Sequence, residues 1–353
     1  MKKLIASLLT LVMLFTLVAC GGGSAAQANN TPSASGAASA PAGSEAEKTS
    51  TADEVYTIAF IAKSATSNWG MRQGEGVTKF NDEFGYEVIY DAPDSKDSAQ
   101  QIALVETYMA QGVNAIIVVP FDVEAMEPTL KRAREQGIKV ITHEASASKE
   151  TDYDIEAVTS EDFGTFGMET IAEQVGDKAG TYVYMVGYFT NGSHNAWGDA
   201  AEARAAKFPN LTVAERVEST ESFEGAQAKT MELIKAYPDL VAIQASSSGD
   251  LPGICNALEE ANLIGKVAVG GLGIPSYMEQ YFANESVKSC ITWDPKNAAY
   301  AACMAAKLTL QGETISEGTN LGQGYDAVKV DGNVVIGSDI NLITAENWAS
   351  FGF

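Results

Sequence analysis

AQGVNAIIVVPFDVEAMEPTLKRAREQGIKVITHEA, residues 110–145, contains the pattern that decides the fold class. NAIIVVP at 114–120 is an almost unbroken apolar run, which is typical of a strand buried on both faces of a parallel sheet. Residues 123–136 have helical spacing and end at Gly137, where a helix commonly needs a left-handed residue. KVITHEA at 139–145 is a second strand. A helix that joins two buried strands predicts a parallel β-α-β unit.

The same alternation continues on both sides of this unit. Before it, strands are predicted at 55–62 and 86–92 and helices at 69–84 and 98–111. After it the alternation restarts, with predicted strands at 154–160, 181–188, 211–219, 240–246, 266–272 and 286–294 and predicted helices at 165–175 and 298–311. Two short strands around Asp331–Gly332 form a predicted hairpin. The sequence therefore predicts an α/β fold with two doubly wound parallel-sheet lobes.

The length and the charge of the chain limit its class. A chain of 353 residues suits about two domains, and a hydrophobic content of 46% is enough for buried cores. The formal net charge of −23 argues against nucleic acid, and against an anionic membrane surface, as partners of the folded part, because like charges repel.

The N-terminal region is predicted to lie outside the fold. Residues 1–19 are expected to be a signal peptide, because two lysines precede the apolar run LIASLLTLVMLFTLVA. LVAC at 17–20 resembles the bacterial lipobox, and this resemblance implies cleavage before Cys20 and a lipid on its thiol. An ordinary signal peptide with an incidental cysteine is the alternative. Residues 20–53 are predicted to be a disordered tether, since they hold no aromatic side chain and no aliphatic side chain larger than alanine.

Three further cysteines, Cys255, Cys290 and Cys303, each lie in an apolar run. Their spacing matches no zinc-binding or CxxC pattern, so we predict that they are small buried hydrophobic residues. One disulfide among them is compatible with an exported protein, and the sequence leaves that choice open.

Motifs for catalysis, metal binding and cofactor binding are missing from the sequence. The histidines His143 and His194 have no HExxH partner, and there is neither a GxSxG elbow nor a GxxxxGK[ST] phosphate loop. The GGLG cluster at 270–273 lacks the acidic residue that a dinucleotide site would need. We predict no catalytic residue, no metal and no cofactor. The alternative, an exported enzyme acting on sugars, would require an acid and a base paired in a cleft.

Polar and aromatic side chains recur just beyond the predicted strand ends. The candidate ligand contacts are Lys63, Asn68, Trp69, His143, Glu144, His194, Asn195, Trp197, Ser246, Ser248, Trp293 and Asp294. The same stretches of sequence also contain Asn191, Ser193, Ser247 and Asp250. Ligands of open parallel sheets bind at the carboxyl ends of the strands. Aromatic rings and hydrogen-bonding side chains suit a small neutral polyol. Each residue taken singly could instead be a core aromatic, a surface charge or a helix cap.

The chain resembles the type I periplasmic binding proteins of the ribose-binding-like superfamily. The resemblance rests on YTIAFIAK at 56–63, the stretch at 110–145, VGGLGIPSYMEQYF at 269–282, TWDPKNAAYAA at 292–302 and the C-terminal residues 324–353. The later segments are similar to the branch of rhamnose-binding and autoinducer-2-binding lipoproteins. The family resemblance implies a Venus-flytrap receptor for an ABC importer, whose two lobes are joined by a three-strand hinge.

The resemblance also implies domain boundaries. Lobe one is expected at 54–160 plus 295–324, and lobe two at 161–294 plus 325–353. The three hinge crossings are expected near 159–161, 293–296 and 323–326.

Carrying the family's site residues onto this chain gives a mixed result. Leu272 stands where ribose-type members have an aspartate in a VGFDG turn. Lys63 matches the lysine of the autoinducer-2 branch, and Glu144 replaces its aspartate. Ser193 and His194 stand in place of an Asp-Gln pair, and Ser246 and Ser248 in place of a proline and an alanine. These differences favour another sugar or polyol.

The predicted function is therefore a lipid-anchored, extracytoplasmic solute-binding protein of an ABC importer, at the cell surface or in the periplasm. We expect a monomer that captures a small sugar-like ligand and docks on a membrane permease. The alternatives are an autoinducer-2 receptor and a sugar sensor with a membrane signalling partner.

Overall fold

The computed structural model describes residues 56–94 and 97–353. The predicted signal peptide, the lipid on Cys20 and the tether lie outside the described residues. Within the described ranges, no helix has both the length and the apolar character of a membrane span.

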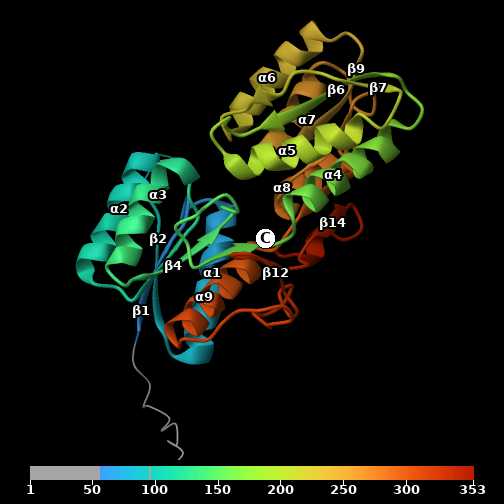
Figure 1. Cartoon of the computed structure of the whole chain (residues 1–353). Helices are drawn as coiled ribbons and strands as arrows, with labels where there is room; N and C mark the ends of the chain where they lie inside the picture. The colour runs from blue at the N-terminus through green and yellow to red at the C-terminus, as the bar shows by residue number, and fades with distance from the viewer. Residues whose placement is uncertain (1–55, 95–96) are drawn as a thin grey trace, which may run out of the picture. The chain divides into compact units, whose positions relative to one another are not determined.

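The first sheet has seven strands in the order β12-β13-β5-β4-β3-β1-β2. Four of them, β1, β2, β4 and β12, are labelled in Figure 1. Its strands are β1 (Thr57–Ile61), β2 (Glu87–Asp91), β3 (Ala115–Val118), β4 (Lys139–His143), β5 (Tyr153–Glu156), β12 (Lys329–Asp331) and β13 (Val334–Ile336). All neighbours pair in parallel except β12 and β13. The helices packed with this sheet are α1 (Asn68–Phe84), α2 (Ser98–Gln111), α3 (Val123–Glu135) and α9 (Pro295–Leu310).

Strand β3 shows why the sheet must be covered on both faces. Ile116 and Val118 pack in one cluster with side chains of α2 and α3. Ala115 and Ile117 pack in another cluster with side chains of α1 and α9. Successive side chains of a strand point to opposite faces, so an unbroken apolar run fills two layers at once. The doubly buried strand predicted from NAIIVVP is confirmed.

The second sheet has the strand order β10-β9-β6-β7, and β8 also pairs with β6. Its strands are β6 (Gly180–Val186), β7 (Leu211–Val213), β8 (Val217–Glu218), β9 (Leu240–Ala245) and β10 (Ala268–Gly271). The helices that follow or precede them are α4 (Ser160–Val175), α5 (Gly192–Ala205), α6 (Phe223–Ala236), α7 (Asp250–Glu260) and α8 (Pro275–Ala283). The single strand predicted at 211–219 is two short strands, because the chain leaves the ladder at Arg216, which pairs with Glu202 and Asp199 of α5.

A small antiparallel pair, β11 (Ser289–Thr292) and β14 (Asn341–Thr344), lies next to the second sheet through a bridge between Leu272 and Ile291, and the 3-10 helix Trp348–Ser350 follows it. The hairpin predicted around Asp331–Gly332 is present between β12 and β13, with Gly332 at a φ of 62°.

The assignment of residues 325–353 to lobe two is wrong for this hairpin. Val334–Ile336 pairs in parallel with Asp154–Glu156 at the edge of the first sheet, and Val335 is fully buried there. The third crossing between the sheets therefore lies between Ile336 and Asn341 rather than near 323–326. The remaining boundaries stay predictions.

The three connecting segments meet at Asp339. Its backbone N–H donates to Ala157 O at 3.1 Å, next to the segment that leaves β5. Its carboxylate oxygen Oδ2 accepts from Asp294 N and from Asn297 Nδ2, each at 3.2 Å, where the chain passes from β11 to α9. A single buried residue thus joins all three connections, through its backbone N–H and its carboxylate.

The cysteines Cys255, Cys290 and Cys303 are buried free thiols, as the prediction of small hydrophobic residues required. The open question of a disulfide is settled for these three residues, which form none. Burial raises the pKa of each thiol.

We predict that Asp339→Ala lowers the free energy of unfolding by about 1–3 kcal/mol, because it leaves the donors of Asp294 and Asn297 without their acceptor. Urea unfolding measures the change. Asp326→Ala, which alters an exposed side chain, is the control. Equal stability of the two variants would contradict the role given to Asp339.

Candidate ligand-binding site

An ion pair lies at the carboxyl edge of the first sheet. Lys63 follows β1 and Glu144 follows β4, and Lys63 Nζ lies 2.8 Å from Glu144 Oε2. The side chains are 20% and 8% exposed, respectively. Glu144 has a φ of 56°, a left-handed backbone conformation that is uncommon for a residue with a side chain. Such conformations persist where the surrounding structure holds them, often at binding sites.

The environment keeps both groups charged. Burial by itself raises the pKa of the Glu144 carboxyl, but the Lys63 ammonium and the His143 imidazole outweigh it and the pKa falls to about 2. Burial lowers the pKa of Lys63, whereas the Glu144 carboxylate raises it, and the net direction is upward. The Lys63–Glu144 pair itself therefore carries no net charge at neutral pH.

Three tryptophans pack edge to face beside this pair. Trp69 of α1 and Trp293, which follows β11, have ring centroids 5.0 Å apart at an interplanar angle of 90°. Trp197 of α5 lies 5.5 Å from Trp293 at 73°. Segments that belong to both sheets thus supply one aromatic group with Trp293 at its centre.

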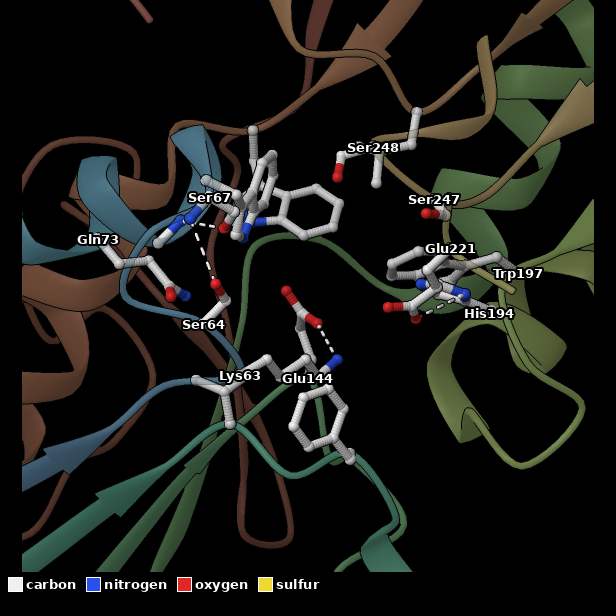
Figure 2. A pocket seen from close by; sticks show the side chains of 16 residues that line it. Lys63, Ser64, Ser67, Gln73, Glu144, His194, Trp197, Glu221, Ser247 and Ser248 are labelled. Atoms are coloured by element: carbon white, nitrogen blue, oxygen red, sulfur yellow. Dashed lines mark hydrogen bonds and ion pairs between the residues drawn. The ribbon is translucent and has the colours of Figure 1, made fainter. Parts of the chain in front are cut away.

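These aromatic and charged residues line a cavity of about 100 Å³ (Figure 2). The lining residues are Lys63, Ser64, Ser67, Trp69, Gly70, Gln73, Val119, Phe121, Glu144, His194, Trp197, Glu221, Ser247, Ser248, Leu272 and Trp293. In Figure 2, Gln73, Ser64 and Lys63 lie on one side and His194, Trp197 and Ser247 lie on the other. The volume suits a small solute.

Two buried donors of the cavity wall lack a protein acceptor. Gln73 Nε2 and Trp293 Nε1 have no hydrogen-bond partner among the residues that the structure describes, and their side chains are 2% and 3% exposed. A buried donor without a partner is costly. An oxygen-bearing ligand in the cavity would supply acceptors for such groups.

His194 lies on the opposite wall of the cavity. Its Nδ1 accepts a hydrogen bond from Gly187 N at 3.2 Å. Nδ1 lies 4.0 Å from Glu221 Oε1. This wall therefore offers an imidazole, a carboxylate and the hydroxyls of Ser247 and Ser248.

The structure brings many of the predicted site residues to one cavity. Those that line it are Lys63, Trp69, Glu144, His194, Trp197, Ser248 and Trp293. Their contact with a ligand stays a prediction.

Three predicted residues do not line the cavity: His143 and Ser246 lie in the protein interior, and Asn195 lies in α5. His143 is fully buried, with its Nδ1 2.5 Å from Ile155 O. Ser246 is also fully buried and donates to Met185 O at 3.0 Å. Asn195 donates to Phe189 O and Asn191 O and accepts from Arg216 Nη1. These internal bonds hold the three side chains away from the cavity wall, and their contact with a ligand stays a prediction.

Asn68 and Asp294 also lie away from this cavity. Asp294 is the N-cap of α9 and forms two hydrogen bonds with Arg72, at 2.9 and 2.7 Å. Asn68 lines a separate hollow near Phe353. Each is the sequence neighbour of a tryptophan of the cavity wall but does not line the cavity itself, and its contact with a ligand stays a prediction.

Several wall residues were not predicted from the sequence, namely Ser64, Ser67, Gly70, Gln73, Val119, Phe121 and Glu221. Leu272 and Ser247 were named, but not as ligand contacts. Gln73 lies four residues after Trp69 in α1, a spacing that places both on one helix face. Phe121 and Glu221 follow β3 and β8, so the strand-end rule applied there would have found them. Gly70 could not be foreseen from the sequence. A Cβ at this position would lie 1.6 Å from the carbonyl oxygen of Ser64, so only glycine fits, and this close approach is a feature of the tertiary structure.

We predict that Glu144→Gln lowers the free energy of unfolding at neutral pH by about 1.5–3 kcal/mol, because Lys63 loses its charged partner. The folded-state pKa of Glu144 lies below its ordinary value of 4.5, so its stabilising contribution is present above that value. The contribution disappears as the pH falls toward about 2.

Urea unfolding of both proteins between neutral pH and pH about 2 measures this effect. The stability difference should shrink over the acid range. Glu87→Gln, at an exposed position of β2, controls for general acid effects. A difference that stays constant down to the lowest pH would rule out the ion pair as its source.

Comparison with known proteins places this fold and site in a family. Residues 58–314 match the family described as a periplasmic binding protein domain. The D-ribose/D-allose-binding protein of Pseudomonas aeruginosa is 24% identical over 233 residues, covering 61% of this chain and 69% of that protein. The xylitol-binding protein of Mycolicibacterium smegmatis is 26% identical over 203 residues, covering 57% of each chain. These relatives are named as binding proteins, in agreement with the prediction that the chain is not an enzyme.

Solved structures share the fold. An ABC transporter solute-binding protein from Clostridium phytofermentas with bound L-rhamnose has a TM-score of 0.75 at 22% identity, covering 84% of this chain and 98% of that one. LsrB from Clostridium saccharobutylicum in complex with AI-2 has a TM-score of 0.75 at 21% identity, covering 84% and 100%. The predicted α/β class with doubly wound parallel sheets is confirmed. The match over most of the described residues shows that the chain belongs to the periplasmic binding protein domain family.

Proposed function

We propose that this chain is the lipid-anchored, extracytoplasmic solute-binding protein of an ABC importer and that it captures a small sugar or sugar-like polyol. The observation that carries the proposal is the cavity wall, in which three tryptophans stand beside an ion pair and several hydroxyls. Tryptophan rings pack on the C–H faces of a sugar, while carboxylate, amide and hydroxyl groups bond its hydroxyls.

The relatives support this ligand class. The two bacterial relatives are named for D-ribose and D-allose and for xylitol, and a structural neighbour holds L-rhamnose. All of these ligands are small polyhydroxylated molecules. The charges of Lys63 and Glu144 compensate each other, which favours an uncharged ligand over an anionic one.

Binding is proposed to work by a population shift between open and closed lobes. We place lobe one at 54–160 plus 295–336 and lobe two at 161–294 plus 341–353, with the connections at Asp339 as the hinge. A ligand that contacts both walls of the cavity is bound best when the lobes are together, so it stabilises that state. The closed monomer then presents a joined surface to a membrane permease.

Autoinducer-2 binding is the second candidate. Lys63 and Glu144 occupy the positions where the resemblance has a lysine and an aspartate, and both line the cavity. LsrB in complex with AI-2 shares the fold. A sugar sensor would use the same cavity, and its membrane partner alone would differ from that of an importer.

Isothermal calorimetry with D-ribose, D-allose, xylitol, L-rhamnose and AI-2 tests the ligand class. We expect binding of at least one sugar or polyol. Binding of AI-2 alone would favour the second candidate. If none of the five gives heat or raises the melting temperature, the proposed ligand class is wrong.

For the compound that binds, we predict that Trp69→Ala weakens affinity roughly ten-fold or more, because a half-buried ring that packs on the ligand is lost. Phe189→Ala removes an aromatic ring that is 55% exposed and lies outside the cavity wall, so it is the matched control. Equal affinity of the two variants would remove Trp69 from the binding surface.

The proposed lipid anchor on Cys20 can be tested separately. We predict that metabolic labelling with a radioactive fatty acid marks the wild-type chain in bacteria and that Cys20→Ser abolishes the label. Undiminished labelling of this variant would contradict lipidation at Cys20.

A further inference from the structure

A hydrogen bond joins the two sides of the cavity outside the hinge. Ser193 Oγ, in the first turn of α5, donates to the backbone carbonyl of Glu144 at 2.8 Å. Glu144 follows β4 of the first sheet, whereas α5 packs with β6 of the second sheet. Ser193 is 6% exposed, so the bond is shielded from water. Ser193 itself does not line the cavity.

The hydroxyl of Ser193 is not needed to begin α5. Asn191 is the N-cap of this helix, and its Oδ1 accepts from His194 N at 3.1 Å. The Ser193 hydroxyl is therefore available for the contact across the cavity. His194, the next residue, lines the cavity. The first turn of α5 thus brings one cavity residue and one cross-sheet donor to the same place.

The acceptor is a residue that needs support. Glu144 is held with a φ of 56°, a left-handed backbone conformation that persists only where neighbouring groups hold it. From within the first sheet, Lys63 holds its carboxylate, and Asp154 Oδ1 accepts from the next amide, Ala145 N, at 3.2 Å. Ser193 holds the carbonyl from the other side.

We infer that Ser193 is a positioning residue that couples the approach of α5 to the orientation of Glu144. When α5 moves away, the carbonyl of Glu144 loses its donor and the residue loses one of its supports. Glu144 then takes its cavity-facing geometry fully only when both walls are together. Ser193 contributes to ligand affinity in this way without touching the ligand. The inference rests on the proposed function, in which Glu144 faces a bound sugar.

Hydrogen exchange of the ligand-free full chain tests the coupling directly. We expect Ser193→Ala to speed exchange of the Ala145 and Ser148 amides, which form hydrogen bonds just after Glu144. The expected acceleration is about five-fold, the equilibrium effect of one ordinary hydrogen bond. The amides in the body of α5 should exchange as in the wild type, because Asn191 still caps the helix. A simple loss of stability would instead speed exchange everywhere.

Thr230→Val is the matched control. It removes a buried hydroxyl that donates to Ala226 O at 2.8 Å within α6, so it breaks a similar bond inside one part of the chain. Exchange at Ala145 and Ser148 should not respond to this change. Unchanged exchange at both amides in Ser193→Ala, or an equal response to Thr230→Val, would overturn the inference.

Calorimetry then tests the effect on binding. For whichever of D-ribose, D-allose, xylitol and L-rhamnose binds the wild type, Ser193→Ala should weaken affinity about five-fold, and Thr230→Val should not. Equal affinity of Ser193→Ala and the wild type would overturn the coupling to binding. If no sugar binds the wild type, the proposed function fails, while the exchange result still decides whether Ser193 positions Glu144.

Discussion

The carboxylate of Asp339 fixes the connections on which the cavity depends. It accepts from the N–H of Asp294, and Trp293, the residue before Asp294, lies at the centre of the aromatic group. The backbone of Asp339 also bonds Ala157, just before α4 begins. Asp339 thus links all three connections between the sheets through its backbone and its carboxylate.

The second constraint is electrostatic. Lys63 and Glu144 place two opposite charges at the edge of one sheet, and the pair is shielded enough that burial would penalise either charge alone. Pairing keeps both ionised and leaves the wall able to bond hydroxyl groups. His143 supports the pair from beneath, with its Nε2 3.6 Å from Glu144 Oε1. A residue that the sequence suggested as a ligand contact thus lies behind the residue that faces the cavity.

Much of the site followed from one rule, that side chains just past parallel strands meet at one edge. Of the residues that the rule named, Lys63, Glu144 and Ser248 line the cavity, whereas His143 and Ser246 lie in the interior. The reason is the two-residue period of a strand, which turns neighbouring side chains to opposite sides. His143 is the last residue of β4 and points into the interior, whereas Glu144 points to the cavity. A shift of one residue at a strand end separates a wall residue from a core residue, and sequence spacing does not resolve it.

The sequence by itself determined the alternation of strands and helices, the doubly buried strands and the family, because apolar periodicity and helix-ending glycines are local signals. Only the tertiary structure decided which sheet the hairpin at Lys329–Ile336 joins, since its strands are too short and too mixed in burial to name a partner. It also decided that Glu221, Gln73 and Trp293 share one wall. These residues are far apart in the chain, and the distance between them depends on how the three connections fold around Asp339.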